Sequence, residues 1–271
     1  MTEQGHGGLA NIAPAEVKQC CARLYEGDFA TYLLGDSFHP GGSELTVRLG
    51  TLLNLQPGQQ VLDVASGTGS SAMLLAERFG VHVIGIDLSL RNIERGATEA
   101  ERRGLSDLVQ FRVGDAERLP VPDAVFDALI CECAFCTFPD KAAAVAEFAR
   151  VLKPGGAVGL SDVTKHAGLA GELTDLMAWI ACLADAMPGE SYAQWLRSVG
   201  FRNVSIETHD EALNAMVSVV RTRLLGAEVL AGLNRLDISG VDMESARQLA
   251  RQAQKAVSSG RLGYAVIVGS R

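Results

Sequence analysis

Carboxylates and glycines occur at a fixed spacing in one part of this 271-residue chain. Residues 61–71 read Val-Leu-Asp-Val-Ala-Ser-Gly-Thr-Gly-Ser-Ser, and residues 83–87 read Val-Ile-Gly-Ile-Asp. An apolar run enters a glycine-rich turn, and a second apolar run ends in Asp87, 20 residues after Gly67. In a βαβ unit, this spacing lets a carboxylate reach the hydroxyls of a ribose. The pattern predicts a site for a nucleotide-containing cofactor.

Asp63 distinguishes between two kinds of cofactor. The spacing Gly67-x-Gly69-x-x-Ala72 also fits the fingerprint of dinucleotide-binding proteins. However, a carboxylate four residues before the first glycine would repel a pyrophosphate, whereas it attracts the ammonium and sulfonium groups of S-adenosylmethionine (SAM). We therefore expect SAM as the cofactor. The alternative is a structural turn in another kind of α/β protein.

The elements that must position these residues follow in order along the chain. Residues 111–117 read as a short strand ending in acids, where Asp115 can accept from an adenine amino group, and residues 124–130 read as a buried strand. Residues 142–152 read as a helix that stops at Lys-Pro-Gly-Gly, and residues 157–162 as the next strand. Together with the glycine turn, this order resembles the class I SAM-dependent methyltransferase family over about residues 45–210.

This resemblance implies an α/β fold with a Rossmann-like, seven-stranded, mostly parallel sheet, and it implies SAM as the cofactor. The residues that it implies as cofactor-binding are Asp63, Ala65, Gly67, Gly69, Asp87, Leu88, Asp115, Ala116 and Cys131.

Helical patterns flank the predicted core on both sides. Residues 14–33 and 43–53 have helical apolar spacing, so we expect residues 1–55 to form an amino-terminal helical arm or lid, before a SAM-binding core of residues 56–210. Residues 203–208 and 263–268 read as the sixth and seventh strands. The stretch between them has two amphipathic patterns, which predicts a helical insertion at 211–260 before the last core strand at 261–271.

Composition narrows the partners and the compartment. The net charge is −8, with no basic stripe, so we expect no nucleic-acid partner. No apolar run approaches the roughly 18 residues that span a bilayer, and the first residues lack a signal-peptide pattern. We therefore expect no membrane partner, a cytoplasmic location, six cysteines present as thiols, and a monomer or a homodimer.

Three thiols lie where the methyl acceptor should bind. Residues 131–136 read Cys-Glu-Cys-Ala-Phe-Cys at the end of the strand that begins near Phe126. Ligands of open α/β sheets bind at the carboxyl ends of the strands. The thiols could be buried small hydrophobes, a redox pair of Cys133 and Cys136, or part of a structural zinc site. They could also hold a soft acceptor such as trivalent arsenic, because soft thiolates select soft ions.

A more specific resemblance favours the last of these readings. Residues 133–141, followed by Arg-Val-Leu-Lys-Pro-Gly-Gly at 150–156, are similar to the arsenite methyltransferase branch, and Cys133 falls on a cysteine of that branch. Residues 179–201 are similar to its second cysteine segment, which places Cys182 at a metalloid-binding position. The resemblance implies trivalent arsenic (arsenite or methylarsenite) held by Cys133, Cys182 and Cys136 as a substrate, with no resident metal. The chain departs from this branch after the glycine loop, at Ser70 and Ser71.

The rival hypothesis keeps the methyltransferase and changes the acceptor to a small organic metabolite methylated on oxygen, nitrogen or carbon. Candidate bases are His39, His166, Glu132 and Tyr192. His39 is the best of them, because His-Pro-Gly-Gly at 39–42 forms a turn that could enter the site. A third hypothesis, a protein that binds SAM but catalyses nothing, is disfavoured by the intact acids Asp63, Asp87 and Asp115.

Overall fold

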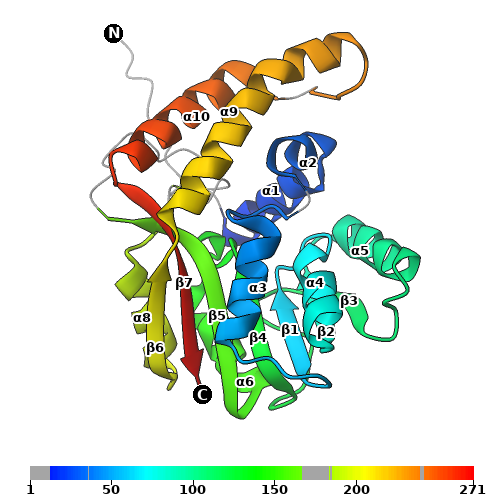
Figure 1. Ribbon diagram of the computed structural model, residues 1–271, viewed down its shortest axis with the longest axis vertical. Coiled ribbons are helices and arrows are strands. Elements are labelled where there is room, and N and C mark those ends of the chain that lie inside the picture. Colours follow the sequence, from blue (N-terminus) through cyan, green and yellow to red (C-terminus); the bar gives the residue numbers. More distant parts are fainter. Residues whose placement is uncertain (1–12, 36, 167–182, 184, 239–240) are drawn as a thin grey trace.

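A seven-stranded sheet forms the centre of the protein in the computed structural model, which describes residues 13–35, 37–166, 183, 185–238 and 241–271. The strand order is β3-β2-β1-β4-β5-β7-β6 (Figure 1). The strands are β1 (Gln60–Val64), β2 (His82–Asp87), β3 (Val109–Val113), β4 (Phe126–Glu132), β5 (Leu152–Lys165), β6 (Arg202–Thr208) and β7 (Leu262–Ser270).

The predicted α/β class with a mostly parallel sheet is confirmed. β1 pairs in parallel with β2 and β4, β2 with β3, and β4 with β5, whereas β7 runs antiparallel to β5 and β6. The order reverses between β1 and β4, and in open α/β sheets this switch point is where ligands bind. The carboxyl ends of β1, β2 and β4 therefore meet at the edge where a cofactor is expected.

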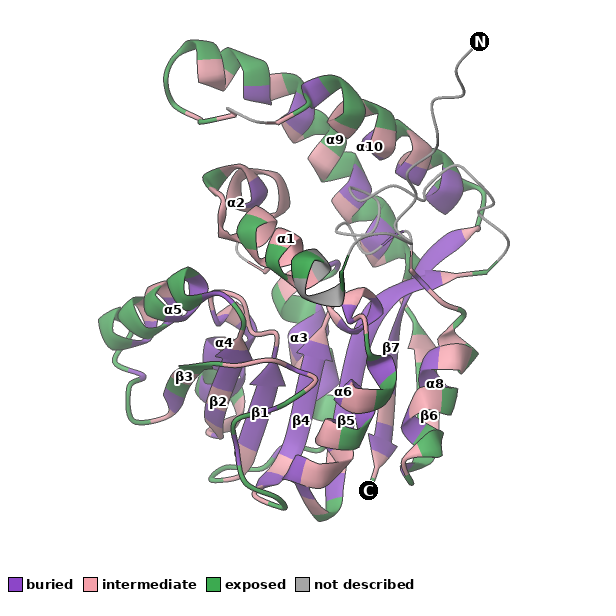
Figure 2. Cartoon of the chain, turned by 180° about the vertical axis from the view of Figure 1, so that it is seen from behind, coloured by how far each residue is buried: buried purple, intermediate pink, exposed green. Residues whose placement is uncertain are grey.

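Helices cover both faces of the sheet. On one face lie α3 (Gly42–Leu52), α4 (Ser70–Phe79) and α5 (Leu90–Arg102), and on the other lie α6 (Lys141–Val151) and α8 (Gly189–Ser198), which are seen from behind in Figure 2. A short 3-10 helix, η2 (Phe135–Thr137), follows β4. The central strands are buried on both sides, as their continuous apolar runs require.

Four helices lie above the carboxyl edge of the sheet (Figure 1). The segment predicted as one helix over residues 14–33 is two helices, α1 (Pro14–Glu26) and α2 (Asp28–Leu34). They separate at Gly27, whose backbone is extended (φ −76°, ψ 144°), because glycine loses more conformational entropy in a helix than other residues and ends helices readily. The helical segment predicted before the last strand forms α9 (Asp210–Gly232) and α10 (Met243–Ser258).

The amino-terminal helices and the α9–α10 pair share a small apolar core of their own. Leu224 and Ala227 of α9 pack with Met243 and Ala250 of α10, and Phe29 and Tyr32 of α2 pack against this group. Tyr32 also donates a hydrogen bond to the backbone carbonyl of Arg223 on α9 at 3.0 Å. Segments from the two ends of the chain therefore form one roof above the sheet. Within the described residues, no helix combines the length and apolar character that crossing a membrane requires.

Candidate active site

The glycine turn after β1 is shaped by backbone geometry and by a close neighbour. Gly69 has φ +79°, and a Cβ atom there would lie 2.1 Å from the ring of Phe111. Any other residue type would strain the left-handed backbone and force the Phe111 ring to move. The amide of Gly67 donates to Oδ2 of Asp87 at 2.9 Å, and the amide of Ser89 donates to Oδ1 at 2.8 Å. Asp87 thus ties the turn to the end of β2, and its burial raises the pKa of its carboxyl group.

A cavity of about 130 Å³ opens beside this turn. Of the residues predicted to bind the cofactor, those on the cavity wall are Ala65, Gly67, Asp87, Leu88, Asp115 and Ala116. The remaining three lie away from the wall. Gly69 shapes the turn, Cys131 is fully buried in β4, and Asp63 is buried in β1. Burial also raises the pKa of the Cys131 thiol well above its usual value.

Asp63 has a buried carboxyl oxygen without a hydrogen-bond partner. Only 2% of the residue is exposed, and its Oδ2 has no hydrogen-bond partner. Burial raises the pKa of Asp63 well above its usual value, Glu132 and Asp87 raise it further, and the amide of Ala72 lowers it. An orphaned carboxylate oxygen in an acidic environment fits a cationic ligand, which SAM is.

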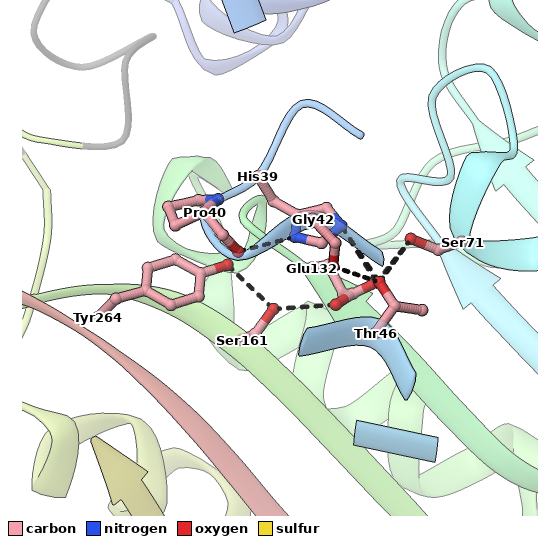
Figure 3. A network of polar contacts seen from close by, with 8 residues as sticks. All are labelled: His39, Pro40, Gly42, Thr46, Ser71, Glu132, Ser161 and Tyr264. Carbon is pink, nitrogen blue, oxygen red and sulfur yellow. Dashed lines mark hydrogen bonds and ion pairs between the residues drawn. The ribbon is translucent and has the colours of Figure 1, made fainter. Parts of the chain in front are cut away.

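Glu132, at the end of β4, is the centre of a buried polar network (Figure 3). Its Oε2 accepts from the hydroxyls of Ser71 at 2.6 Å and Thr46 at 3.0 Å, and its Oε1 accepts from Ser161 at 3.4 Å. Tyr264 of β7 extends the network through a 3.0 Å contact with the hydroxyl of Ser161. These hydroxyls join α3, α4, β5 and β7 to one carboxylate. Sequence reasoning missed this role of the hydroxyls, because isolated Ser and Thr residues carry no spacing signal.

His39 is part of the same network and is buried, with 6% of the residue exposed. Its Nδ1 lies 3.1 Å from the carbonyl of Pro40, so Nδ1 carries a proton, because a carbonyl only accepts. Its Nε2 lies 3.3 Å from Thr46 Oγ1 and 3.7 Å from Glu132 Oε2. His39 lines a groove between the α2–α3 connection and α9 and is not on the wall of the cofactor cavity. His39 therefore contacts Glu132 and does not line the cofactor cavity.

Helix α1 contributes Lys18 to the wall of the cavity beside Asp115. Its ammonium group donates to Asp115 Oδ2 at 2.7 Å and also to Glu117. Although burial acts to lower the pKa of Lys18, its two carboxylate partners raise it above the usual value. Cys21 and Tyr25, on the same helix, line the cavity. Sequence analysis predicted Asp115 but missed Lys18, because a partner 97 residues away leaves no local pattern.

A second, apolar cavity of about 180 Å³ shares three wall residues with the first: Tyr25, Phe38 and Cys133. Its other walls come from α1, α2, α9 and α10, the end of β5 and residues 40 and 183. Cys133 follows β4 with a left-handed backbone (φ +53°), which turns the chain at the junction of the two cavities. The site therefore has a polar compartment beside the glycine turn and an apolar compartment under the roof helices.

The other predicted acceptor residues are not brought to this junction. Cys136 is fully buried, and its amide donates to Asp162 Oδ2 at 2.8 Å. Tyr192 is fully buried and donates to the carbonyl of Val163 at 2.7 Å, and His166 lies 4.0 Å from Asp210, away from both cavities. Cys182 lies outside the described residues. Sequence analysis did not predict Cys21 as a site residue, yet the structure places it on the cofactor cavity.

Comparison with known proteins places this site in a family context. A family model described as a methyltransferase domain matches residues 62–160. The maize (Zea mays) phosphoethanolamine N-methyltransferase 1 is 37% identical over 177 residues, which cover 65% of this chain but only 34% of the maize protein. The 27-O-demethylrifamycin SV methyltransferase of Amycolatopsis mediterranei is 30% identical over 195 residues, covering 66% of this chain and 72% of that protein. The chain thus spans about a third of the length of the plant relatives.

An arsenite methyltransferase is also among the similar proteins. The enzyme of Halobacterium salinarum is 33% identical over 161 residues, covering 58% of this chain and 41% of that protein. Among solved structures, phosphoethanolamine N-methyltransferase 2 of Haemonchus contortus, in complex with phosphomonomethylethanolamine and S-adenosylhomocysteine (SAH), superimposes with a TM-score of 0.79. It is 17% identical, and the match covers 96% of this chain and 60% of that one, which shows a shared fold.

Proposed function

Because this chain belongs to the family of SAM-dependent methyltransferases, we propose that it transfers the methyl group of SAM to an organic acceptor with a largely apolar body. The observation that carries the proposal is the apolar cavity under the roof helices, which meets the cofactor cavity at Tyr25, Phe38 and Cys133. The reacting atom of the acceptor would lie beside Cys133, and its apolar part between α2, α9 and α10.

The composition of this cavity supports an apolar acceptor over a small polar one. Among the described residues, its walls contain no charged side chain. Apolar surface buried there gains about 25 cal/mol per Å², whereas an unpaired polar group would cost a few kcal/mol. Leu24, Phe29, Met216 and Val220 are typical of its walls. The walls provide binding energy for hydrocarbon and none for a phosphate or an oxyanion.

The residues of the chain contribute mainly binding, orientation and exclusion of water. SAM supplies an electrophilic methyl group on a sulfonium, which leaves as a neutral thioether. Asp87, Ala65 and Glu132 line the cofactor cavity, and Asp63 is buried in β1 with one carboxyl oxygen unpartnered. The roof helices hold the acceptor against the methyl donor and exclude water, so positioning supplies much of the rate. A tertiary amine would attack through its lone pair and needs no base, whereas a phenol or an alcohol must lose its hydroxyl proton, and Glu132 on the wall of the cofactor cavity is a candidate to accept that proton.

A second candidate, methyl transfer to trivalent arsenic, rests on one observation. Cys21 and Cys133 both line the cofactor cavity, and two thiols on one cavity could bind a soft metalloid. Burial, with a contribution from Cys20, raises the pKa of Cys21 to about 11. Its thiol is therefore protonated at neutral pH and would have to lose that proton on binding, which favours the organic acceptor.

The test compares acceptors and matched variants on one helix of the roof. Labelled SAM would be incubated with arsenite, methylarsenite and a panel of apolar phenols, amines and terpenoid alcohols. Ala250→Leu fills the apolar cavity, whereas Gln248→Leu places a leucine on the exposed side of α10. We expect an organic acceptor whose KM rises at least tenfold in Ala250→Leu, with SAM affinity unchanged and with no effect of Gln248→Leu.

The opposite outcome is equally clear. Turnover with arsenite alone, abolished in Cys21→Ser and Cys133→Ser but unaffected in Ala250→Leu, would replace the organic acceptor with the metalloid. The cysteine variants should retain SAM affinity in either case, because neither thiol is needed to hold the sulfonium.

A further inference from the structure

Three carboxyl groups lie close together near the carboxyl ends of adjacent strands: Asp63 of β1, Asp87 of β2 and Glu132 of β4. Asp87 and Glu132 line the cofactor cavity, and Asp63 is buried in β1. We call the three groups the carboxylate cluster. Only 4% of the Glu132 side chain and 2% of Asp63 are exposed. Within the described residues, no lysine or arginine forms an ion pair with any member of the cluster. Such a concentration of buried negative charge needs either protons or a cation from outside the chain.

The unpartnered oxygen of Asp63 shows where the charge is least satisfied. One oxygen of this carboxyl group accepts from the amide of Ala72, whereas Oδ2 has no partner. The oxygens of Asp87 accept from two backbone amides, and those of Glu132 accept from hydroxyls. Asp63 is therefore the member that most needs a proton or a cation, in line with its raised pKa, for which burial, Glu132 and Asp87 are responsible.

The groups that face the cluster from neighbouring elements do not supply a fixed cation. Cys131 and Tyr264 have pKa values raised by burial, so both are neutral at neutral pH. Thr46, Ser71 and Ser161 offer hydroxyls, and Asp162 and Cys133 lie nearby on β5 and after β4. Among the described residues, the side-chain nitrogen that lies within ion-pair distance of the cluster is His39 Nε2, 3.7 Å from Glu132 Oε2.

The cofactor and its product differ by one positive charge. SAM carries a sulfonium, an ammonium and a carboxylate, a net charge of +1. SAH lacks the sulfonium and is neutral overall. We propose that the carboxylate cluster loses a proton when SAM binds but keeps it when SAH binds, so that the protein discriminates between cofactor and product by charge. In this step one carboxyl O–H bond breaks, the proton passes to the buffer, and the new carboxylate faces the sulfonium.

This linkage makes the preference for SAM over SAH depend on pH. If one proton is released with SAM and none with SAH, the ratio of the two affinities rises by up to about tenfold for each pH unit. Product inhibition should then weaken as pH rises. The inference depends on the cofactor and the cluster, and is independent of the identity of the methyl acceptor.

Isothermal titration calorimetry of the full chain tests the proposal directly. SAM and SAH would each be titrated between pH 5.0 and 6.5, where their amino groups stay protonated, in two buffers with different ionisation enthalpies. We expect a release of about 0.3 to 1 proton with SAM and close to none with SAH, and a rise in the affinity ratio of at least about threefold over this range.

Variants assign the proton to the cluster. Asp63→Asn and Glu132→Gln should each reduce the proton release and flatten the pH dependence of the ratio. Asp127→Asn removes a carboxyl group that pairs with Lys153 at the opposite end of β4 from Glu132, and it should leave the release intact. Equal proton release with SAM and SAH in the unmodified protein, or a flat ratio, overturns the proposal without any variant. Release that persists in both cluster variants would overturn the assignment, and if Asp63→Asn does not fold, Glu132→Gln alone decides.

Discussion

Replacing Asp162 with asparagine should change how the stability of the protein depends on pH. This carboxyl group is fully buried on β5, where Oδ2 accepts from the amide of Cys136 and Oδ1 from the amide of Val163, both at 2.8 Å. Burial raises its pKa from 3.8 to about 6, against the lowering effect of these hydrogen bonds. A group whose folded-state pKa is raised stabilises the fold fully below the unfolded pKa and loses that contribution as pH rises through the folded pKa.

The size of the effect follows from the shift. A rise in the pKa of Asp162 from 3.8 to about 6 lowers the free energy of unfolding by about 3 kcal/mol between pH 4 and pH 7. Asparagine does not ionise, so the variant lacks this loss. The asparagine side chain has one acceptor oxygen, whereas the backbone amides of Cys136 and Val163 each need an acceptor. Leaving a buried amide unpaired costs about 1–3 kcal/mol. Asp162→Asn should therefore be less stable than the unmodified protein near pH 4.5 and about as stable near pH 8.

Urea unfolding at pH 4.5, 6 and 8, at constant ionic strength, measures this difference. Asp127→Asn is the control. Although burial acts to raise the pKa of Asp127, Lys153 and the amide of Gln60 lower it overall, so its titration lies below the range tested. The stability difference caused by Asp127→Asn should be constant from pH 4.5 to 8. The same constancy for Asp162→Asn would refute the assignment of a raised pKa to Asp162.

Three further changes test the cofactor site. Asp87→Ala should weaken SAM binding by about 1.5–3 kcal/mol, because it removes hydrogen bonds to a charged group, and unchanged affinity in calorimetry would remove Asp87 from the site. Lys18→Met should speed SAH dissociation about two- to fivefold in stopped-flow measurements, because α1 loses its ion pairs, and an unchanged rate would show that α1 does not limit release. Gly69→Ala should lower both SAM affinity and thermal stability, since its Cβ would overlap the Phe111 ring; wild-type values for both would contradict the geometry.

The sequence predicts the core of this fold well, because each part of the core has a local signal. Continuous apolar runs predicted strands close to β1, β4 and β7, and the glycine turn lies between β1 and α4 as expected. The spacing from Gly67 to Asp87 predicted a carboxylate that can reach the ribose of a cofactor, and the structure places both residues on one cavity, with the amide of Gly67 donating to Asp87. This spacing can be read from the sequence because only one helix, α4, separates the glycine turn from β2, the strand that ends in Asp87.

The acceptor side is harder to predict, because it depends on contacts between distant segments. The cysteines at 131–136 look alike in the sequence, yet the backbone after β4 places Cys133 at the junction of the two cavities and buries Cys136. The contact between Thr46 and Glu132 spans 86 residues, and the one between Lys18 and Asp115 spans 97. Periodicity along the chain carries no information about which side chains meet when helices fold over a sheet.

Helix α1 lines both cavities, which has a consequence for the order in which cofactor and acceptor would bind. Lys18 binds Asp115 and Glu117, Cys21 lines the cofactor cavity, and Tyr25 lines both cavities. An acceptor that packs against Tyr25 and Leu24 would hold α1 in place and thereby stabilise the ion pairs over the cofactor. By reciprocity, SAM that orders α1 would raise acceptor affinity by the same factor. The apolar cavity would thus serve closure of the site as well as recognition of the acceptor.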